Sequence, residues 1–466
     1  MTRRALRGRF VLRLVEGQEL EHIATHRDVR LGAAPPAAAI DRGGAVDRAV
    51  RRHSPGLLVS RAYSARDGLL GRGAPHLAWD PVERALGMSR TFRVEVDPDA
   101  PLRPLVEDLS ALGGVEMAAP EYLVESPAAT ARRADHDDAD DHDTDAARRL
   151  IRADEALALE PGDSALIIGL VDSGVNLEHA EVQGRLRPGL SSVALAQDNL
   201  DADMVVVSGA HPRLQDVDDD QGHGTSCASI MSANGFRMAR GLAGATRLLP
   251  VRALCGARVA EPGGGSRVTA VGSIQDIDSG TKSCIDLGAR VLNLSFGTPE
   301  RMLEPGAPVP HVEVVRYALA RDCVLVAASG NSGSDERFFP AALPGVIAVG
   351  AVDAEGRPAT FTTRGDHVAL CAPGQGVRAA RLDGYGAVNG TSFAAPFVAA
   401  AAALLLARGA RRSVPLPPEA VRQILLDSVS PFPGGANAHG CGAGILDVLA
   451  ALAAVDRHAQ EVDEAA

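Results

Sequence analysis

Five short apolar runs constrain the fold of this chain more than any other feature, because they lack the alternation of a strand with one wet face. They cover residues 166–171, 247–251, 291–294, 324–328 and 346–349, and they are rich in Val, Leu and Ile. Such strands are covered on both faces, and helical patterns separate them here. The sequence therefore predicts an α/β domain with a mostly parallel central sheet, whose site lies at the carboxyl ends of the strands.

The first 126 residues have a different pattern. Residues 91–96 alternate apolar and polar side chains, as in a strand with one wet face, and Leu102, Leu105 and Leu109 recur at helical spacing. A small antiparallel α+β domain fits this region. Residues 61–90, rich in Gly and Arg and containing the sole tryptophan, predict a long insertion or loop.

Residues 127–149 are predicted to be an acidic, flexible linker. The run 135–145 is so densely acidic that it cannot bury surface, and such a segment is a ready place for proteolytic nicking. A metal-binding patch that uses His136 and His142 is the alternative hypothesis. The α/β domain is then expected over residues 150–452, and residues 453–466 are expected to form a polar tail.

Composition and the chain's apolar segments exclude several classes of partner. The net charge of -12 argues against nucleic acid, whose phosphates require a basic face. The longest apolar run, 393–407, contains Pro396 and is shorter than the roughly 18 residues of a membrane span, so it predicts a buried helix. No secretory signal is evident near Met1, which favours a cytoplasmic protein with secretion as the alternative.

Six cysteines (Cys227, Cys255, Cys284, Cys323, Cys371 and Cys441) are scattered without CxxC spacing. They predict neither a zinc site nor a compact disulfide scaffold. Reduced, buried thiols are expected, and disulfides remain the alternative for an exported chain.

Three polar residues stand where such a sheet would present a reaction site. Asp172 directly follows an apolar run, so its carboxylate can orient an imidazole. His223 lies between two glycines, and an imidazole is well suited to accept a proton near neutral pH. Ser392 stands where a glycine turn enters a helix, with Pro396 expected in the first helical turn. Together they supply a nucleophile, its base and the group that orients the base.

Asn331 is a fourth candidate, again just past an apolar run. Its side-chain N–H can donate to the oxyanion of a tetrahedral intermediate, together with the backbone N–H of Ser392. Each of the four residues alone has a simpler explanation, such as a turn residue or a helix cap. The set as a whole predicts acyl-transfer chemistry.

These motifs resemble those of the subtilisin-like serine proteases, the subtilase family. The resemblance rests on residues 171–174 (VDSG), 222–225 (GHGT), 329–331 (SGN) and 390–396 (GTSFAAP), in the order Asp, His, Ser. It implies a subtilisin-like three-layer fold and a serine endopeptidase that acts on polypeptides. Asp172 would then orient His223, His223 would be the general base, Ser392 the nucleophile and Asn331 the oxyanion donor.

The resemblance also implies substrate-binding residues. Ser295, Phe296 and Gly297 would form the edge that pairs with the substrate backbone, with an ordinary strand end as the alternative. Ala328, Ser329 and Gly330 would form a wall of the primary specificity pocket. Phe338 falls near the floor of that pocket, and we hypothesise that it narrows the pocket toward small side chains. Cys227 is interpreted as a small buried hydrophobe, with redox or mercurial sensitivity as the alternative.

No cofactor is expected for the chemistry. Family members often carry a calcium-binding Asp where this chain has Glu181, so a structural calcium ion is a further hypothesis. Candidate oxygen ligands are Glu181, Asp216, Asp218, Asp219 and Asp220, and no ligand set is assigned.

The first domain resembles the propeptide of the family, a small ferredoxin-like chaperone and inhibitor, and its closing residues 120–125 are similar. The resemblance predicts a zymogen that cleaves itself between Val124 and Leu150, with its own N-terminal domain as intramolecular inhibitor. Two alternatives are a catalytically silent peptide-binding or regulatory module on this scaffold and a dedicated maturation protease for one precursor peptide.

Overall fold

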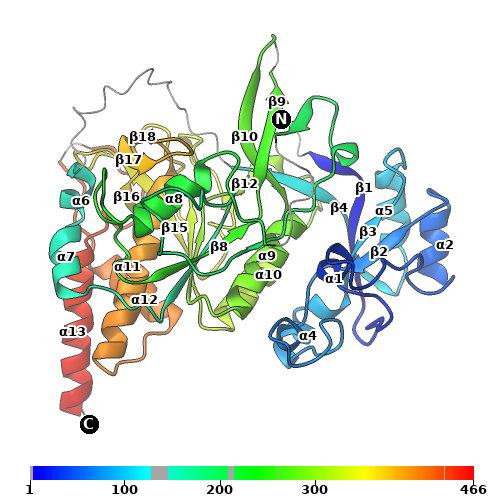
Figure 1. Cartoon of the computed structure of the whole chain (residues 1–466), viewed down its shortest axis with the longest axis horizontal. Coiled ribbons are helices and arrows are strands. Elements are labelled where there is room, and N and C mark those ends of the chain that lie inside the picture. Colours follow the sequence, from blue (N-terminus) through cyan, green and yellow to red (C-terminus); the bar gives the residue numbers. More distant parts are fainter. Residues whose placement is uncertain (1–3, 127–144, 208–214, 262, 435, 466) are drawn as a thin grey trace.

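A computed structural model describes residues 4–126, 145–207, 215–261, 263–434 and 436–465. Residues 127–144 of the predicted linker, with His136 and His142, lie outside the described residues, whereas residues 146–149 belong to the helix α6 (Ala146–Leu150) and are not a flexible linker. Figure 1 shows two parts side by side, the N-terminal one coloured blue to cyan and the larger one green to red.

Seven parallel strands form the central sheet of the larger part, in the order β16-β15-β13-β11-β5-β8-β6. The strands are β5 (Ile167–Asp172), β6 (Leu190–Ser191), β8 (Arg247–Arg252), β11 (Val291–Leu294), β13 (Val324–Ala328), β15 (Val346–Val352) and β16 (Val368–Pro373). All five predicted runs are among them, which confirms the predicted parallel sheet. β16 was not predicted, although all six of its residues are buried.

Helices cover both faces of this sheet and make three layers. They are α6 (Ala146–Leu150), α7 (Ala153–Leu159), α8 (His223–Ser232), α9 (Ile274–Asp286), α10 (Val312–Leu319), α11 (Thr391–Arg411), α12 (Pro418–Asp427) and α13 (Val448–Ala465). In β5, Ile168 and Leu170 belong to the core with α8 and α11, whereas Ile167 and Val171 belong to the core with α9 and α10. Both faces of the strand are therefore buried, and for this reason the run shows no alternation.

The N-terminal part contains a four-stranded antiparallel sheet in the order β2-β3-β1-β4. Its elements are β1 (Ala5–Leu14), α1 (His26–Arg30), α2 (Ala45–Arg51), β2 (Leu58–Arg61), α3 (Arg66–Leu69), α4 (Pro81–Ala85), the 3-10 helix η1 (Met88–Arg90), β3 (Thr91–Glu95), α5 (Leu102–Ser110) and β4 (Val115–Glu125). The helix α5 follows the leucine spacing seen in the sequence, with Leu105 and Leu109 buried.

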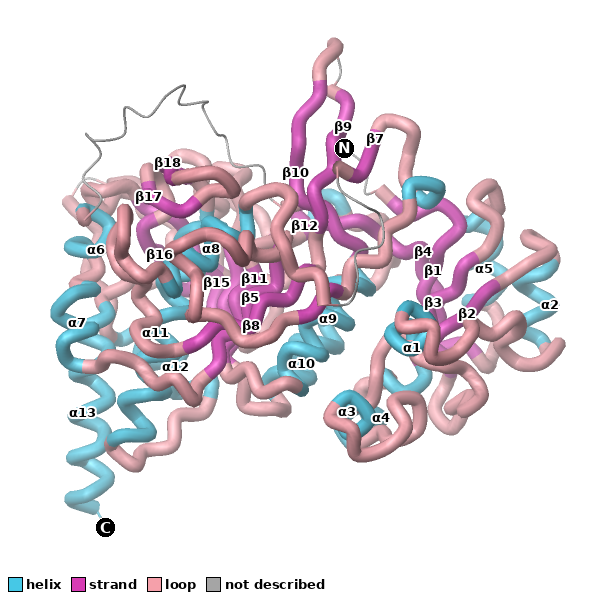
Figure 2. The backbone as a smooth tube through the Cα atoms, in the orientation of Figure 1, coloured by secondary structure: helices cyan, strands magenta, loops and turns pink. Residues whose placement is uncertain are grey.

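This sheet continues into the larger part. Strand β4 pairs antiparallel with β10 (Ser266–Ser273), β10 pairs with β9 (Cys255–Ala260), and β9 pairs with β7 (Met204–Val206). Figure 2 shows the resulting run of strands between the two parts. The remaining elements are the 3-10 helices η3 (Gln197–Asn199) and η4 (Glu300–Met302) and the short strands β12 (Thr298–Pro299), β14 (Phe338–Phe339), β17 (Val377–Ala380) and β18 (Tyr385–Val388).

Three segments differ from the sequence-based expectation. Residues 61–90 contain α3, α4 and η1 instead of a structureless loop, and Trp79 joins the core beside α9 and α10. The expected polar tail continues α13 as far as Ala465. The predicted buried helix is α11, which at 21 residues is long and apolar enough to cross a membrane, yet 89% of its most apolar window is buried inside the protein. It is the central helix of one core.

Candidate active site

Asp172 and His223 form a buried pair at the carboxyl end of β5. The Nδ1 of His223 donates to Oδ1 of Asp172 at 2.7 Å, and the two residues are 51 positions apart in the chain. His223 is the first residue of α8, and Gly222 before it has a φ of 97°, which favours glycine. A Cβ on Gly224 would lie 3.1 Å from that of Asp172, so a glycine allows the helix to approach the carboxylate closely.

Burial and the charge of Asp172 shift the pKa of His223 in opposite directions. Burial is the largest effect and lowers the pKa of the imidazole, but the charge of Asp172 and its hydrogen bond outweigh burial and hold the pKa well above its usual value. The pair therefore stabilises the imidazolium ion that forms once the neutral imidazole has accepted a proton.

Ser392 is the second residue of α11 and is 1% exposed. Its Oγ donates to the carbonyl oxygen of Ser295 at 3.2 Å, and the Nε2 of His223 has no hydrogen-bond partner among the described residues. The structure thus brings the expected nucleophile to one end of the sheet but does not form the expected Ser–His hydrogen bond. Catalytic hydrogen bonds of this kind are often long without substrate.

Pro396 lies in the second turn of α11, not in the first turn as expected. Because proline has no N–H, the carbonyl oxygen of Ser392 lacks its helical donor. That oxygen instead accepts from Oγ of Ser295 at 2.8 Å and from Sγ of Cys227 at 3.4 Å. Ser295, which follows β11, and Cys227 on α8 thus bind the first turn of α11.

Asn331 has one orientation that its neighbours determine. Its Oδ1 accepts from the backbone N–H and from the hydroxyl of Thr391, both at 2.9 Å. The Nδ2 side is therefore turned away from Thr391, and a Cβ on Gly390 would lie 3.3 Å from it. The amide group can donate into the space beside Ser392. Sequence reasoning missed Thr391, although it immediately precedes the serine.

The expected substrate edge is occupied by the end of the N-terminal domain. Gly297 forms an antiparallel bridge with Glu125, and residues 123–125 pair with β10 on their other side. The backbone N–H of Ser126 also donates to the carbonyl oxygen of Ala270 at 2.8 Å. The last residues of β4 therefore lie between two edges, as an extended peptide substrate would.

Phe338 lies between the expected substrate edge at Gly297 and the expected wall of the primary pocket at Gly330. A Cβ on Gly297 would lie 2.5 Å from Cε1 of Phe338, and a Cβ on Gly330 would lie 3.1 Å from its Cδ2. Ala328 and Ser329 are buried beside Gly330, and Ser329 donates to the carbonyl oxygen of Thr363 at 3.1 Å. The phenyl ring fills the space between Gly297 and Gly330.

The expected carboxylate ligands for a cation face N–H and O–H donors instead. Glu181 accepts from the backbone N–H groups of residues 235–237 at 2.8–3.2 Å and from the hydroxyl of Tyr385 at 3.1 Å. Asp219 accepts from Ser173 and from the N–H and hydroxyl groups of Thr225. Donors direct positive charge at these oxygens, so neither group fits a calcium site.

Asp219 instead organises the turn before His223. Besides those contacts, its Oδ1 accepts from the backbone N–H of Gly222 at 2.9 Å. Sequence reasoning grouped Asp219 with its acidic neighbours, whereas its position four residues before His223 was the informative signal. Asp220 pairs with Arg252 at 2.9 Å, and Asp218 is exposed, so the four aspartates do not converge.

Cys227 completes a close cluster with the buried pair. Ligand atoms of Asp172, His223 and Cys227 lie within 4.8 Å of one another, the one such cluster found in the described part of the chain. Burial raises the pKa of the Cys227 thiol. A protonated thiol that donates to the carbonyl oxygen of Ser392 agrees with a structural role.

The chain is similar to known proteins over its larger part. Residues 163–444 match the profile described as the Subtilase family, Peptidase_S8. The chain is 34% identical over 262 residues to a thermophilic serine proteinase of Bacillus sp. (strain AK1), with 55% of this chain and 56% of that protein covered. It is 30% identical over 260 residues to thermitase of Thermoactinomyces vulgaris, with 56% and 81% covered.

A solved structure is also similar. The prenylagaramide maturation protease PagA superposes with a TM-score of 0.50 at 25% identity, over 65% of this chain and 98% of that one. The chain spans less than two thirds of several relatives that it matches, including 24% of the cell wall-associated protease of Bacillus subtilis (strain 168).

Proposed function

The chain belongs to the subtilase family, and from this premise we propose that it is a serine endopeptidase that acts on polypeptides. The observation that carries the proposal is the buried 2.7 Å hydrogen bond between Asp172 and His223 at the sheet end where α11 presents Ser392. A silent peptide-binding module would need neither the buried pair nor the oriented amide of Asn331. No cofactor is needed for chemistry of this kind.

The proposed reaction assigns one step to each group. Oγ of Ser392 attacks the peptide carbonyl while Nε2 of His223 takes its proton, and Asp172 stabilises the resulting imidazolium. The backbone N–H of Ser392 and Nδ2 of Asn331 donate to the oxyanion. His223 then gives the proton to the leaving amine, and water hydrolyses the acyl-enzyme.

Labelling with a fluorophosphonate probe separates an enzyme from a silent module. We expect the wild-type chain, once processed, to be labelled and the Ser392→Ala variant to remain unlabelled. Ser279→Ala is a matched control, because Ser279 lies on α9 and donates to the carbonyl oxygen of Asp276. Equal labelling of wild type and Ser392→Ala would rule out Ser392 as the nucleophile.

We further propose that Phe338 restricts the primary pocket to small side chains. Its ring fills the space between Gly297 and Gly330, so a large side chain of the substrate would meet it directly. The residues that follow Ser126 are Pro127, Ala128 and Ala129, which are small as well.

Replacing Phe338 with alanine is expected to let the primary pocket accept larger side chains of the substrate. In a peptide series that varies only the residue before the scissile bond, kcat/KM for phenylalanine relative to alanine should rise about tenfold or more, since each methylene group in a pocket changes the ratio by roughly 10–200-fold. The alanine peptide is the internal control for folding. A wild-type enzyme that already prefers large aromatic residues would contradict the assignment.

The N-terminal domain is proposed to act as an intramolecular inhibitor. The support is its position on the substrate edge, through the bridge from Glu125 to Gly297. Buried ion pairs also join the two parts. Nζ of Lys282, the sole lysine, lies 2.5 Å from Oε1 of Glu83, and Arg93 lies 2.6 Å from Asp276. Separating the domains would break both pairs and leave the carboxylates of Glu83 and Asp276 without these cations, although Lys282 would keep Asp286 and Arg93 would keep Glu121. The loss of two buried pairs favours retention of the inhibitor.

A dedicated maturation protease is the second candidate. PagA is described as a maturation protease, and nearly the whole length of PagA is similar to part of this chain. A pocket narrowed by Phe338 also favours a restricted set of substrates over general digestion. Proteome-wide cleavage profiling with one dominant site motif would support this candidate, and many unrelated sites would favour a general protease.

We propose that Glu181 holds residues 235–237 without a cation. The amide donors outweigh burial, the largest effect on Glu181, and lower the pKa of its carboxyl. A chelator should therefore leave Tm and activity unchanged. Glu181→Gln should lower the free energy of unfolding by about 1–3 kcal/mol, because it leaves amide donors unsatisfied. Each kcal/mol lost should lower Tm by roughly 2–4 °C. Exposed Glu178→Gln is the control, and a chelator-induced fall in Tm would contradict this role.

A further inference from the structure

The end of β4 places one acidic side chain, that of Glu125, at the proposed substrate edge. The backbone of Glu125 forms the antiparallel bridge with Gly297, and on its other side it pairs with Val271 of β10. Pairing of this kind fixes the register of an extended peptide, so Glu125 marks one defined position along it. We call this place the Gly297 position, after the residue that pairs with it.

A cation of the larger part faces the Gly297 position. Nη2 of Arg267, on β10, donates to Oε2 of Glu125 at 2.6 Å, although the two residues are 142 positions apart in the chain. Each of the two side chains is 32% exposed, so the pair is partly shielded from water. A hydrogen bond between two charged groups is stronger than one between neutral groups. The contact can therefore distinguish a carboxylate from an amide of the same shape.

Arg267 stands on a hairpin that belongs to the larger part. The hairpin of β9 and β10 projects beyond the central sheet (Figure 1), and β9 pairs with β10 along its whole length. Val259 lies across from Arg267 and joins a buried core with Val193 and Met204. The backbone that carries Arg267 is thus held by elements that do not depend on the N-terminal domain alone.

The nearest other cation belongs to the N-terminal domain and has partners of its own. Arg4 donates to both carboxylate oxygens of Asp203, at 2.6 and 2.9 Å. Among the residues that the structure describes, Arg267 forms an ion pair with Glu125 alone. Removal of the N-terminal domain would take away Arg4 and Glu125 together. Arg267 would then be left to face the side chain of whichever peptide occupies the Gly297 position.

We propose that Arg267 determines specificity by selecting polypeptide substrates with a carboxylate side chain, above all glutamate, at the Gly297 position. The inference rests on the proposed endopeptidase function, because it takes the end of β4 to mark the place of a bound substrate. Arg267 contacts a side chain of the peptide and takes no part in acyl transfer. Complementary charge favours the acidic peptide, and a basic side chain would meet a like charge.

Three peptides test this selection with the wild-type enzyme after self-processing. They have the sequence of residues 120–131, with Glu, Gln or Lys at position 125. We expect kcat/KM for the Glu peptide to exceed that for the Gln peptide about threefold to tenfold, since partial exposure limits the gain from the charged hydrogen bond. The Lys peptide should be cut most slowly, and added salt should reduce these differences. Mass spectrometry checks that all three are cut at the same bond.

Substitutions of Arg267 test whether this residue is the cause. Arg267→Gln should bring the ratio of kcat/KM for the Glu and Gln peptides to about one, because the charged hydrogen bond is lost. Arg267→Glu should reverse the order, so that the Lys peptide is cut faster than the Glu peptide. Each ratio compares two peptides with one enzyme preparation, so a change in the amount of folded protein cancels.

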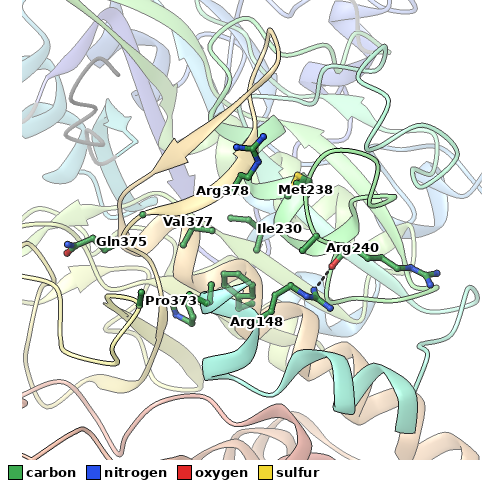
Figure 3. Close-up of a pocket in the computed structure, with 14 residues that line it drawn as sticks. Arg148, Ile230, Met238, Arg240, Pro373, Gln375, Val377 and Arg378 are labelled. Atoms are coloured by element: carbon green, nitrogen blue, oxygen red, sulfur yellow. Dashed lines mark hydrogen bonds between the residues drawn. The ribbon is translucent and has the colours of Figure 1, made fainter. Parts of the chain in front are cut away.

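Arg378→Gln is the matched control for the loss of one arginine. Arg378 is half-buried on a strand, as Arg267 is, but it lies on β17. Figure 3 shows Arg378 at a pocket that residues of α6, α8 and β17 line. This variant should keep the wild-type ratio.

Two results would overturn the proposal while the endopeptidase function stands: equal kcat/KM for the Glu and Gln peptides in the wild type, or a Glu preference that persists in Arg267→Gln. A double-mutant cycle in the full-length Ser392→Ala chain tests the contact without turnover. Hydrogen exchange at residues 123–126 should rise in Glu125→Gln and in Arg267→Gln, and the double variant should show less than the sum. Additive effects would overturn the pairing itself. If the chain cuts no peptide and the cycle still shows coupling, the proposed function fails and Arg267 remains a residue that binds a carboxylate at this edge.

Discussion

Replacing Ser392 with alanine should abolish peptide hydrolysis, with a loss of about 10⁶-fold in kcat, the size known for the nucleophile or its histidine in subtilisin. The reason is that Oγ forms the acyl-enzyme, and no other hydroxyl stands at the start of α11 beside His223 except that of Thr391, which donates to Asn331. A discontinuous peptide assay with purified, processed protein measures the loss.

The same variant tests self-cleavage. The wild-type chain should shorten on incubation by a cut between Val124 and Leu150, and activity should rise as the inhibiting domain is cut from the substrate edge. Ser392→Ala should remain at full length, and mass spectrometry of the fragments locates the cut. If both proteins stay at full length, or if both are cut at the same rate, self-processing is excluded. Ser279→Ala again serves as the control for the substitution itself.

Replacing Asp172 with asparagine should lower kcat by about 10⁴-fold, because the imidazole loses both its correct tautomer and the stabilisation of its cation. The geometry of the site should survive, since the two side chains have the same shape. A circular dichroism spectrum and Tm close to those of the wild type would verify this.

In the same variant, the pH dependence of kcat/KM is expected to shift in a definite direction. His223 must be neutral to accept a proton, so wild-type kcat/KM should rise with pH through a midpoint above the usual histidine value. Without the Asp172 charge and hydrogen bond, burial is opposed only by Cys227, so the pKa of His223 falls and the residual activity should have its acidic limb at lower pH. Asp218→Asn, an exposed carboxylate in the loop before His223, should change neither quantity. An acidic limb that stays in place in Asp172→Asn would contradict the pairing.

The sequence by itself determined the strands of the central sheet, because a strand buried on both faces leaves a local apolar run that needs no partner to be recognised. β5, β11 and β13 lie where those runs predicted. It also predicted that Asp172 stands at the end of such a strand and that Ser392 stands at the start of a helix. These are statements about short segments, and short-range patterns suffice for them.

Only the tertiary structure decided which distant groups meet. It brings Asp172 and His223, which are 51 residues apart in the sequence, into a hydrogen bond, and it directs backbone amide groups at the carboxylate oxygens of Glu181. It placed Phe338 between Gly297 and Gly330, and it packed residues 61–90 on α9 and α10 through the buried pair of Lys282 and Glu83. Contacts of this kind depend on how sheets and helices pack over long separations in sequence, and no local pattern of residues encodes them.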